Sequence, residues 1–280
     1  GATLILNKAH HSLPSLGETC RRLTRELRFL VGANIYMTPA NARGFSKHRD
    51  DHDVLILQID GRKTWIIYPA DGPAVELELR PGDLLFLPRD FWHEARCESS
   101  SSVHVTLSLN ASTGYELLEE LTAVARERPE FRYPIHHGFE SQAARQNFDL
   151  DFEGKVLALL REVTGSGLLE RRFADLVKNQ RQGWRGRFSD IVHLDEITPD
   201  TVLCARPEIL SRVTSDGKSL FFEFADSRIT VPVFLKSCLD RIASGEPFAV
   251  KELQGLITES GKLELIRQFV QHGFLAIVRR

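Results

Sequence analysis

Six short apolar segments bounded by turn residues lie between residues 33 and 110, and they restrict this part of the chain to an all-β architecture. Asp60-Gly61 separates two of these segments and is a strong hairpin signal, because glycine accepts positive φ. Pro81-Gly82 marks a second sharp turn. We therefore expect an antiparallel sandwich or small barrel. Its strands are predicted at residues 33–38, 54–59, 63–68, 75–79, 83–87 and 103–109.

The pattern becomes helical after Gly114, where Leu117, Leu121 and Val124 recur on one face of a segment that ends near Pro129. Further amphipathic stretches follow within residues 152–176. The C-terminal part predicts a strand at 220–224, helices at 233–242, 250–256 and 263–271, and a last strand at 274–278, an order typical of a winged helix. We expect a β-domain at 1–112, a helical region at 113–215 and a winged-helix domain at 216–280.

Composition excludes little for this chain of 280 residues. A hydrophobic content of 42%, a charged content of 26% and a net charge of −2 are those of ordinary globular proteins, and they give no global reason to expect nucleic acid as a partner. No run approaches the ~20 apolar residues of a membrane span, so we expect no membrane partner and a cytoplasmic location. The chain begins at Gly1 rather than Met, so the first domain is expected to be N-terminally incomplete.

Cysteine spacing argues against two kinds of site. Cys20, Cys97, Cys204 and Cys238 lie far apart and form no CxxC pair. Neither a disulfide framework nor a thiolate zinc site is therefore expected.

A His-x-Asp pair, His48 and Asp50, is the first candidate for metal chemistry, because alternate residues of an extended segment point to one side. Taken alone it is weak, and a solvated charged loop is the competing interpretation. His93 strengthens it, since this histidine follows the predicted strand at 83–87. Two imidazoles and one carboxylate make a facial triad that leaves coordination positions open. His104 on a late strand is the alternative third ligand, or a group that lines the site.

Five motifs in order along the chain resemble those of the ribosomal oxygenases, which are cupin-type JmjC enzymes that hydroxylate residues of ribosomal proteins. The resemblance covers residues 1–112. The motifs are Asn34-Ile35-Tyr36-Met37-Thr38-Pro39, Gly44-Phe45 with His48-Arg49-Asp50, Val54-Leu55-Ile56-Leu57-Gln58 followed by Gly61-Arg62-Lys63-Thr64-Trp65, Pro81-Gly82-Asp83-Leu84-Leu85, and His104-Val105-Thr106-Leu107-Ser108. The link from Tyr68 to Val75 is shorter than the corresponding family stretch.

The resemblance implies a double-stranded β-helix of the cupin or jelly-roll type, then a helical dimerisation region and a C-terminal winged-helix domain. It implies Fe(II) bound by His48, Asp50 and His93. It also implies 2-oxoglutarate as cosubstrate, with Lys63 pairing with its distal carboxylate and Tyr36 and Thr106 donating hydrogen bonds to it. Asn34, His104 and Ser108 would line the pocket.

The sequence thus predicts a 2-oxoglutarate-dependent dioxygenase that consumes dioxygen and hydroxylates a protein or peptide side chain. By the same resemblance, the first expectation for the substrate is a histidine or arginine of a ribosomal protein, and a homodimer is expected. Four alternatives remain open: hydroxylation of a peptide natural product, action on methyl-lysine, a metal-dependent cupin that does not use 2-oxoglutarate, and a metal-binding cupin sensor with a DNA-binding winged helix. The last would need a basic recognition face, whereas Lys251, Lys262 and Arg267 alternate with Glu252, Glu259 and Glu264.

Overall fold

The computed structural model describes residues 2–135, 141–165, 167–181, 183 and 186–278. Its strands are β1 Leu4–Leu6, β2 Leu30–Thr38, β3 Asp53–Gly61, β4 Lys63–Tyr68, β5 Val75–Leu79, β6 Leu84–Leu87, β7 Trp92–Arg96, β8 Ser102–Asn110, β9 Val202–Ala205, β10 Ser211–Ser215, β11 Ser219–Phe224, β12 Ser227–Pro232, β13 Phe248–Ala249 and β14 Leu275–Ile277. Its α-helices are α1 Pro14–Leu27, α2 Gly114–Arg126, α3 Gln142–Gly165, α4 Leu168–Asn179, α5 Arg187–Val192, α6 Lys236–Ala243 and α7 Glu259–Gln271. In the described ranges, none of these helices combines the length and apolarity that crossing a bilayer requires.

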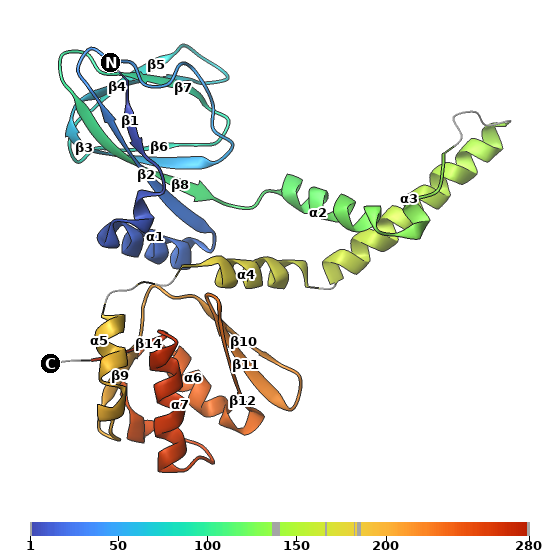
Figure 1. Ribbon diagram of the computed structural model, residues 1–280. Coiled ribbons are helices and arrows are strands. Elements are labelled where there is room, and N and C mark those ends of the chain that lie inside the picture. Colours follow the sequence, from blue (N-terminus) through green and yellow to red (C-terminus); the bar gives the residue numbers. More distant parts are fainter. Residues whose placement is uncertain (1, 136–140, 166, 182, 184–185, 279–280) are drawn as a thin grey trace. The chain divides into compact units, whose positions relative to one another are not determined.

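Two antiparallel sheets build the N-terminal β-domain (Figure 1). One has the strand order β1-β2-β8-β3-β6 and the other the order β5-β4-β7. The six strands predicted from the sequence are confirmed as β2, β3, β4, β5, β6 and β8. The pattern did not predict β1, β7 or the helix α1, and in β7 charged residues interrupt the apolar signal.

The two faces of the five-stranded sheet pack against different elements. Helix α1 starts with Pro14, whose fixed φ suits a first helical position, and its Leu16, Cys20 and Leu23 pack on the outer face of β2 and β8. On the inner face, Val54 and Ile56 of β3 pack against residues of the smaller sheet such as Trp65 and Ala95. The sheets thus enclose an interior that is apolar along β3, while other strands contribute the polar side chains described below.

Residues 112–175 form a compact helical unit, separate from a unit that takes in residues up to 111 together with those from 176 on. Helix α2 begins at an N-cap, in which Thr113 Oγ1 accepts a hydrogen bond from the backbone N–H of Glu116. Its Leu117, Leu121 and Val124 pack on a small core centred on Leu159 and Val163 of α3. The predicted helical character of this region is confirmed.

The C-terminal part has its own core, in which Phe222, Phe224, Phe269 and Phe274 pack ring against ring. It contains the sheets β10-β11-β12 and β13-β9-β14. The predicted strand at 220–224 and the helices at 233–242 and 263–271 are confirmed, with the terminal strand shortened to β14.

The predicted helix at 250–256 is wrong, because the chain forms only a 3₁₀ turn at Val250–Glu252. The backbone N–H groups of Val250 and Lys251 donate to the carbonyl oxygens of Thr201 and Pro199. Phe248 just before them pairs with β9. These two N–H groups are therefore already hydrogen-bonded beside β9 at the position where the predicted helix would begin.

Candidate metal centre

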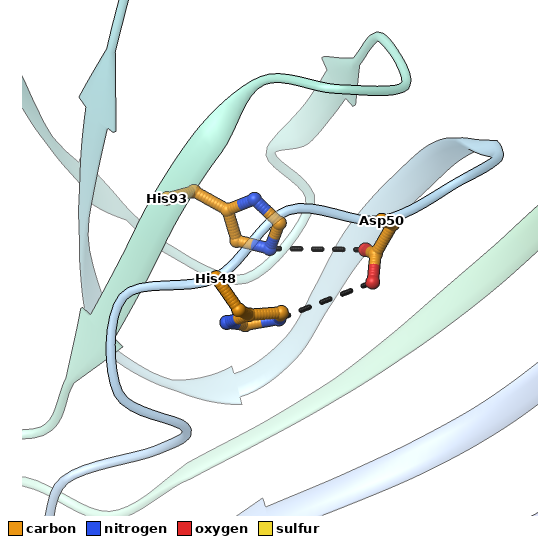
Figure 2. A group of neighbouring side chains, drawn as sticks. All are labelled: His48, Asp50 and His93. Atoms are coloured by element: carbon orange, nitrogen blue, oxygen red, sulfur yellow. Dashed lines mark ion pairs between the residues drawn. The ribbon is translucent and has the colours of Figure 1, made fainter.

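The segment that carries His48 and Asp50 runs beside β7, the strand that carries His93 (Figure 2). His48 and His93 exchange two backbone hydrogen bonds of 3.0 and 2.8 Å, and the N–H of Asp90 donates to the carbonyl of Asp50 at 2.8 Å. This irregular antiparallel pairing places all three side chains on the same side of the two segments.

One potential ligand atom from each of these residues lies within 4.8 Å of the other two. Asp50 lies close to both histidines, since its two carboxylate oxygens lie 3.8 Å from His93 Nε2 and 4.0 Å from His48 Nε2. A metal ion placed among the three atoms would meet two nitrogens and one oxygen. Burial lowers the pKa of His93, which favours the neutral imidazole that a metal requires.

Both histidines present Nε2 to this group for the same local reason. His48 Nδ1 lies 2.8 Å from the carbonyl oxygen of Ser46, and His93 Nδ1 lies 2.9 Å from that of Phe91. A carbonyl only accepts, so each Nδ1 must carry the proton and each Nε2 keeps its lone pair. The backbone two residues upstream thereby fixes the tautomer of each ring, a support typical of metal-binding histidines.

The other two histidines near the group lie outside it among the described residues. His52 turns to its neighbour, with Nδ1 2.8 Å from Asp51 Oδ1. His104 is buried on β8, and burial together with the positive charge of Lys63 lowers its pKa to about 3. A neutral imidazole that lies near a buried ammonium group suits a pocket wall better than a third ligand.

Lys63 is the most unusual charge in the β-domain, because its side chain is only 3% exposed. Its ammonium donates to Thr38 Oγ1 at 3.1 Å, and no carboxylate in the described part of the chain lies within ion-pair distance. Burial lowers the pKa of Lys63 to about 8. Burying a cation without a counter-ion is costly, so this arrangement favours an anionic ligand.

Trp65 connects the buried lysine with the metal-binding group. The ring centroid of Trp65 is 5.6 Å from Lys63 Nζ and 6.0 Å from the ring centroid of His93. Trp65 also makes an edge contact with His104, with the ring centroids 5.5 Å apart. His104 in turn stacks on Tyr36, with the ring centroids 4.9 Å apart. The two halves of the site therefore belong to one interior.

A family model described as "JmjC domain" matches residues 12–76 and 69–117, which contain the histidine-aspartate group and Lys63. Residues 12–117 thus match the JmjC domain model. Two similar curated proteins are the "Bifunctional lysine-specific demethylase and histidyl-hydroxylase NO66" of Drosophila persimilis, 37% identical over 136 residues, and "Ribosomal oxygenase 1" of Homo sapiens, 32% identical over 154 residues. These alignments cover 42% and 45% of this chain but only 20% and 24% of the relatives.

Solved structures extend the similarity beyond the JmjC domain at the level of the fold. A structure of YcfD, described as a ribosomal oxygenase from Escherichia coli, is 17% identical and has a TM-score of 0.55 over 99% of this chain and 78% of that chain. A second YcfD structure, in complex with cobalt and 2-oxoglutarate, is 16% identical with a TM-score of 0.54. The β-domain predicted as a cupin-type jelly roll thus has the fold of these neighbours.

Strand register places the predicted pocket residues of the JmjC domain in rows across its sheet. Tyr36 pairs with His104, and the next row inward pairs Asn34 with Thr106. Alternate residues of a strand share a face, so these four side chains lie on one side of β2 and β8. Ser108 shares that face but lies one row further from Lys63, where its Oγ is 3.2 Å from Asn110 Nδ2. The side-chain oxygen of Asn34 accepts from the backbone N–H of Lys8.

Three further polar residues of the JmjC domain reach the same interior and were missed by the sequence interpretation. Thr38 contacts Lys63 directly, while Gln58 donates to Ser102 Oγ at 2.8 Å beside His104. All three are buried. Their common signal is strand parity, since Thr38 follows Tyr36 by two residues and Ser102 precedes His104 by two.

Unpaired buried atoms mark the space between these residues. His104 Nδ1, Trp65 Nε1 and Gln58 Oε1 are buried and have no hydrogen-bond partner among the described residues. Buried polar atoms are normally satisfied, so several orphans around one buried cation indicate that a polar ligand completes the site.

Proposed function

We propose that this chain is an iron(II)- and 2-oxoglutarate-dependent oxygenase that hydroxylates a protein or peptide side chain. The observation that carries the proposal is the convergence of His48, Asp50 and His93 beside a buried lysine. A lone metal-binding group is compatible with many cupins, but the adjoining anion site favours an oxygenase that uses a ketoacid.

The donor set fits iron(II). Two neutral imidazoles and one carboxylate are the ligands of the non-haem iron oxygenases, which keep open positions for cosubstrate and dioxygen. The described part of the chain adds no fourth histidine, cysteine or carboxylate to the group. A closed tetrahedral zinc site is therefore not favoured.

The pocket fits 2-oxoglutarate. Lys63 would pair with the distal carboxylate, and the hydroxyls of Tyr36, Thr38 and Thr106 would donate to or orient that end. The apolar ring of Trp65 would shield the carbon chain between the lysine and the metal ligands. When bound, the iron and ketoacid together activate dioxygen, with succinate and carbon dioxide as products of the ketoacid. The protein's own part is to hold the reactants in line, with Lys63 as the partner of the distal carboxylate.

The substrate proposal comes from the relatives. The Drosophila relative carries "histidyl-hydroxylase" and "lysine-specific demethylase" in its name, and the human one is called a ribosomal oxygenase. We place hydroxylation of a histidine or arginine in a ribosomal protein first and a peptide natural product second. A cytoplasmic location stays a prediction from the sequence.

The regions after the JmjC domain are proposed as a dimerisation region, 113–215, and a winged-helix domain, 216–280. Exposed apolar side chains on the helical unit support the first, since Tyr115, Leu118, Leu150 and Leu169 are each more than half exposed. The C-terminal helices α6 and α7 with the hairpin β11–β12 support the second. Mixed charge on that domain favours a protein rather than a nucleic-acid contact.

The experiment that tests the proposal measures the turnover of 2-oxoglutarate. The purified chain is incubated with iron(II), 2-oxoglutarate and candidate ribosomal proteins, while succinate is quantified and products are screened for a gain of about 16 Da, one oxygen atom. Succinate formation coupled to a +16 product would establish the activity and name the substrate. Iron-dependent turnover that survives both His48→Ala and Asp50→Ala would remove the proposed centre.

A further inference from the structure

Two cationic residues, Lys47 and Arg49, are sequence neighbours of the metal-binding residues His48 and Asp50. Lys47 precedes His48, and Arg49 lies between His48 and Asp50. Arg49 faces away from the metal centre, because successive side chains of an extended segment point to opposite sides. Lys47 contacts Tyr68 and Trp92 on that same outer side. Neither has a role in holding the metal or the cosubstrate.

The side chains of Lys47 and Arg49 contact two aromatic rings, Tyr68 and Trp92, of the three-stranded sheet β5-β4-β7. Lys47 Nζ is 3.6 Å from the ring centroid of Tyr68 and 5.8 Å from that of Trp92, and Arg49 Cζ is 5.5 Å from Trp92. Tyr68 and Trp92 are register partners on β4 and β7. Trp92 directly precedes His93, so the aromatic surface is fixed to the strand that carries the third ligand.

The backbone pairing of this segment with β7 is interrupted just before the metal-binding residues. Its pairing with β7 joins Gly44 to Ala95 and then His48 to His93, so four steps along the segment oppose two along the strand. Residues 45–47 bulge there, and among the described residues their N–H groups and carbonyls make no hydrogen bond to β7. Both metal-binding residues of the segment, His48 and Asp50, follow directly after this bulge.

We propose that Lys47 and Arg49 are positioning residues that hold the bulged segment against Tyr68 and Trp92, so that His48 and Asp50 stay within coordinating distance of His93. The hydroxyl of Tyr68 donates to Glu94, which orients its ring beneath the ammonium of Lys47. Arg49 also lies 3.7 Å from Asp90, whose N–H donates to the carbonyl of Asp50. Lys47 thus holds the chain just before His48, and Arg49 holds it just before Asp50.

The test is metal affinity of the full chain, measured without turnover. Apoprotein is titrated with cobalt(II), and the visible absorption of the bound ion reports both affinity and ligand geometry. Lys47→Ala combined with Arg49→Ala is expected to weaken cobalt binding about 3- to 10-fold and to alter the spectrum, since each exposed cation–π contact is modest. Lys47→Arg with Arg49→Lys keeps both cations and is expected to restore affinity.

A matched control removes the same charge elsewhere. Arg80 lies after β5 and pairs with Glu78, and Lys236 pairs with Asp240 on α6, so Arg80→Ala with Lys236→Ala should leave cobalt binding unchanged. Trp92→Leu should resemble the double variant, and Trp92→Phe should lie between it and the wild type. If the double variant fails to fold, the two single alanine variants carry the test.

The proposal rests on the metal centre proposed above, and the readouts separate the two failures. Unchanged cobalt affinity and spectrum in the double variant, with a raised KM for the substrate, would assign the cations to substrate binding and overturn the positioning role. A wild type that binds cobalt but never consumes 2-oxoglutarate would remove the oxygenase function and leave the positioning role intact. A wild type that binds no cobalt would overturn both.

Discussion

Lys63 donates a hydrogen bond to Thr38 Oγ1 at 3.1 Å while both side chains are buried inside the β-domain. Thr38 ends β2 and Lys63 begins β4, so the contact joins the two sheets. A neutral hydroxyl orients the ammonium but leaves its charge unbalanced. The buried ammonium is therefore a destabilising charge that an anionic cosubstrate would neutralise.

Removing any one of the three metal-binding residues should strongly weaken metal binding. We expect His48→Ala, Asp50→Ala and His93→Ala each to lower iron or cobalt affinity by on the order of 100-fold or more, since even outer-shell partners contribute roughly 10- to 100-fold. Isothermal titration with the metal measures this. His52→Ala is the control, because its ring turns to Asp51. A ligand variant that keeps wild-type affinity would contradict the assignment.

Lys63→Ala should impair cosubstrate binding without removing the metal. Loss of a buried charge partner is typically worth about 3–5 kcal/mol, so the KM for 2-oxoglutarate should rise by on the order of 100-fold or more. Succinate formation as a function of 2-oxoglutarate concentration gives this value, and metal titration in parallel checks that the centre is intact. An unchanged KM would mean that the anion site lies elsewhere.

Affinity for 2-oxoglutarate should fall as pH rises through about 8. The pKa of Lys63 in the empty protein is lowered to about 8 by burial, and only the protonated form can pair with a carboxylate. Binding above this pH must therefore be accompanied by proton uptake. Calorimetry in buffers of different ionisation enthalpy measures that proton. Binding that is independent of pH between 7 and 9 would exclude Lys63 as the anion partner.

The apoprotein should gain stability as the pH rises from about 8 to 10.5. The unfolded lysine titrates near 10.5 and the folded one near 8, so between these values the unfolded state binds more protons. The free energy of unfolding then rises with pH, by up to roughly 3 kcal/mol at about 1.4 kcal/mol per pKa unit. Denaturant titrations of wild type and Lys63→Met test this, because the methionine variant lacks the charge and should lose that rise. A rise retained in Lys63→Met would assign it to another group.

Thr38→Val should weaken cosubstrate binding by a smaller amount than Lys63→Ala. Valine keeps the shape but removes the oxygen that orients the ammonium, and we expect the KM for 2-oxoglutarate to rise about 3- to 10-fold, less than the full value of a hydrogen bond to a charged group. Thr230→Val on β12 is the matched control, because Thr230 is an exposed strand residue outside the β-domain. Equal effects of the two variants would show that the contact is not specific.

The amino-acid sequence by itself determined the strands of the β-domain and the candidates for chemistry. Apolar runs between turn residues located β2 to β6 and β8, because side-chain alternation and turn chemistry are local properties. The same locality explains the failure at 250–256, where the backbone donors of Val250 and Lys251 are taken by residues some fifty positions away in the chain. No local pattern contains that information.

Only the tertiary structure decided which polar residues share the interior. His93 joins His48 and Asp50 because its strand pairs with their segment, while His104, the alternative third ligand in the sequence, is held on β8 beside Lys63. Thr38, Gln58 and Ser102 entered the site in the same way, through register across the sheet. Spacing along the chain sets which face a side chain occupies, but the pairing of distant strands sets its neighbours, and the chemistry depends on those neighbours.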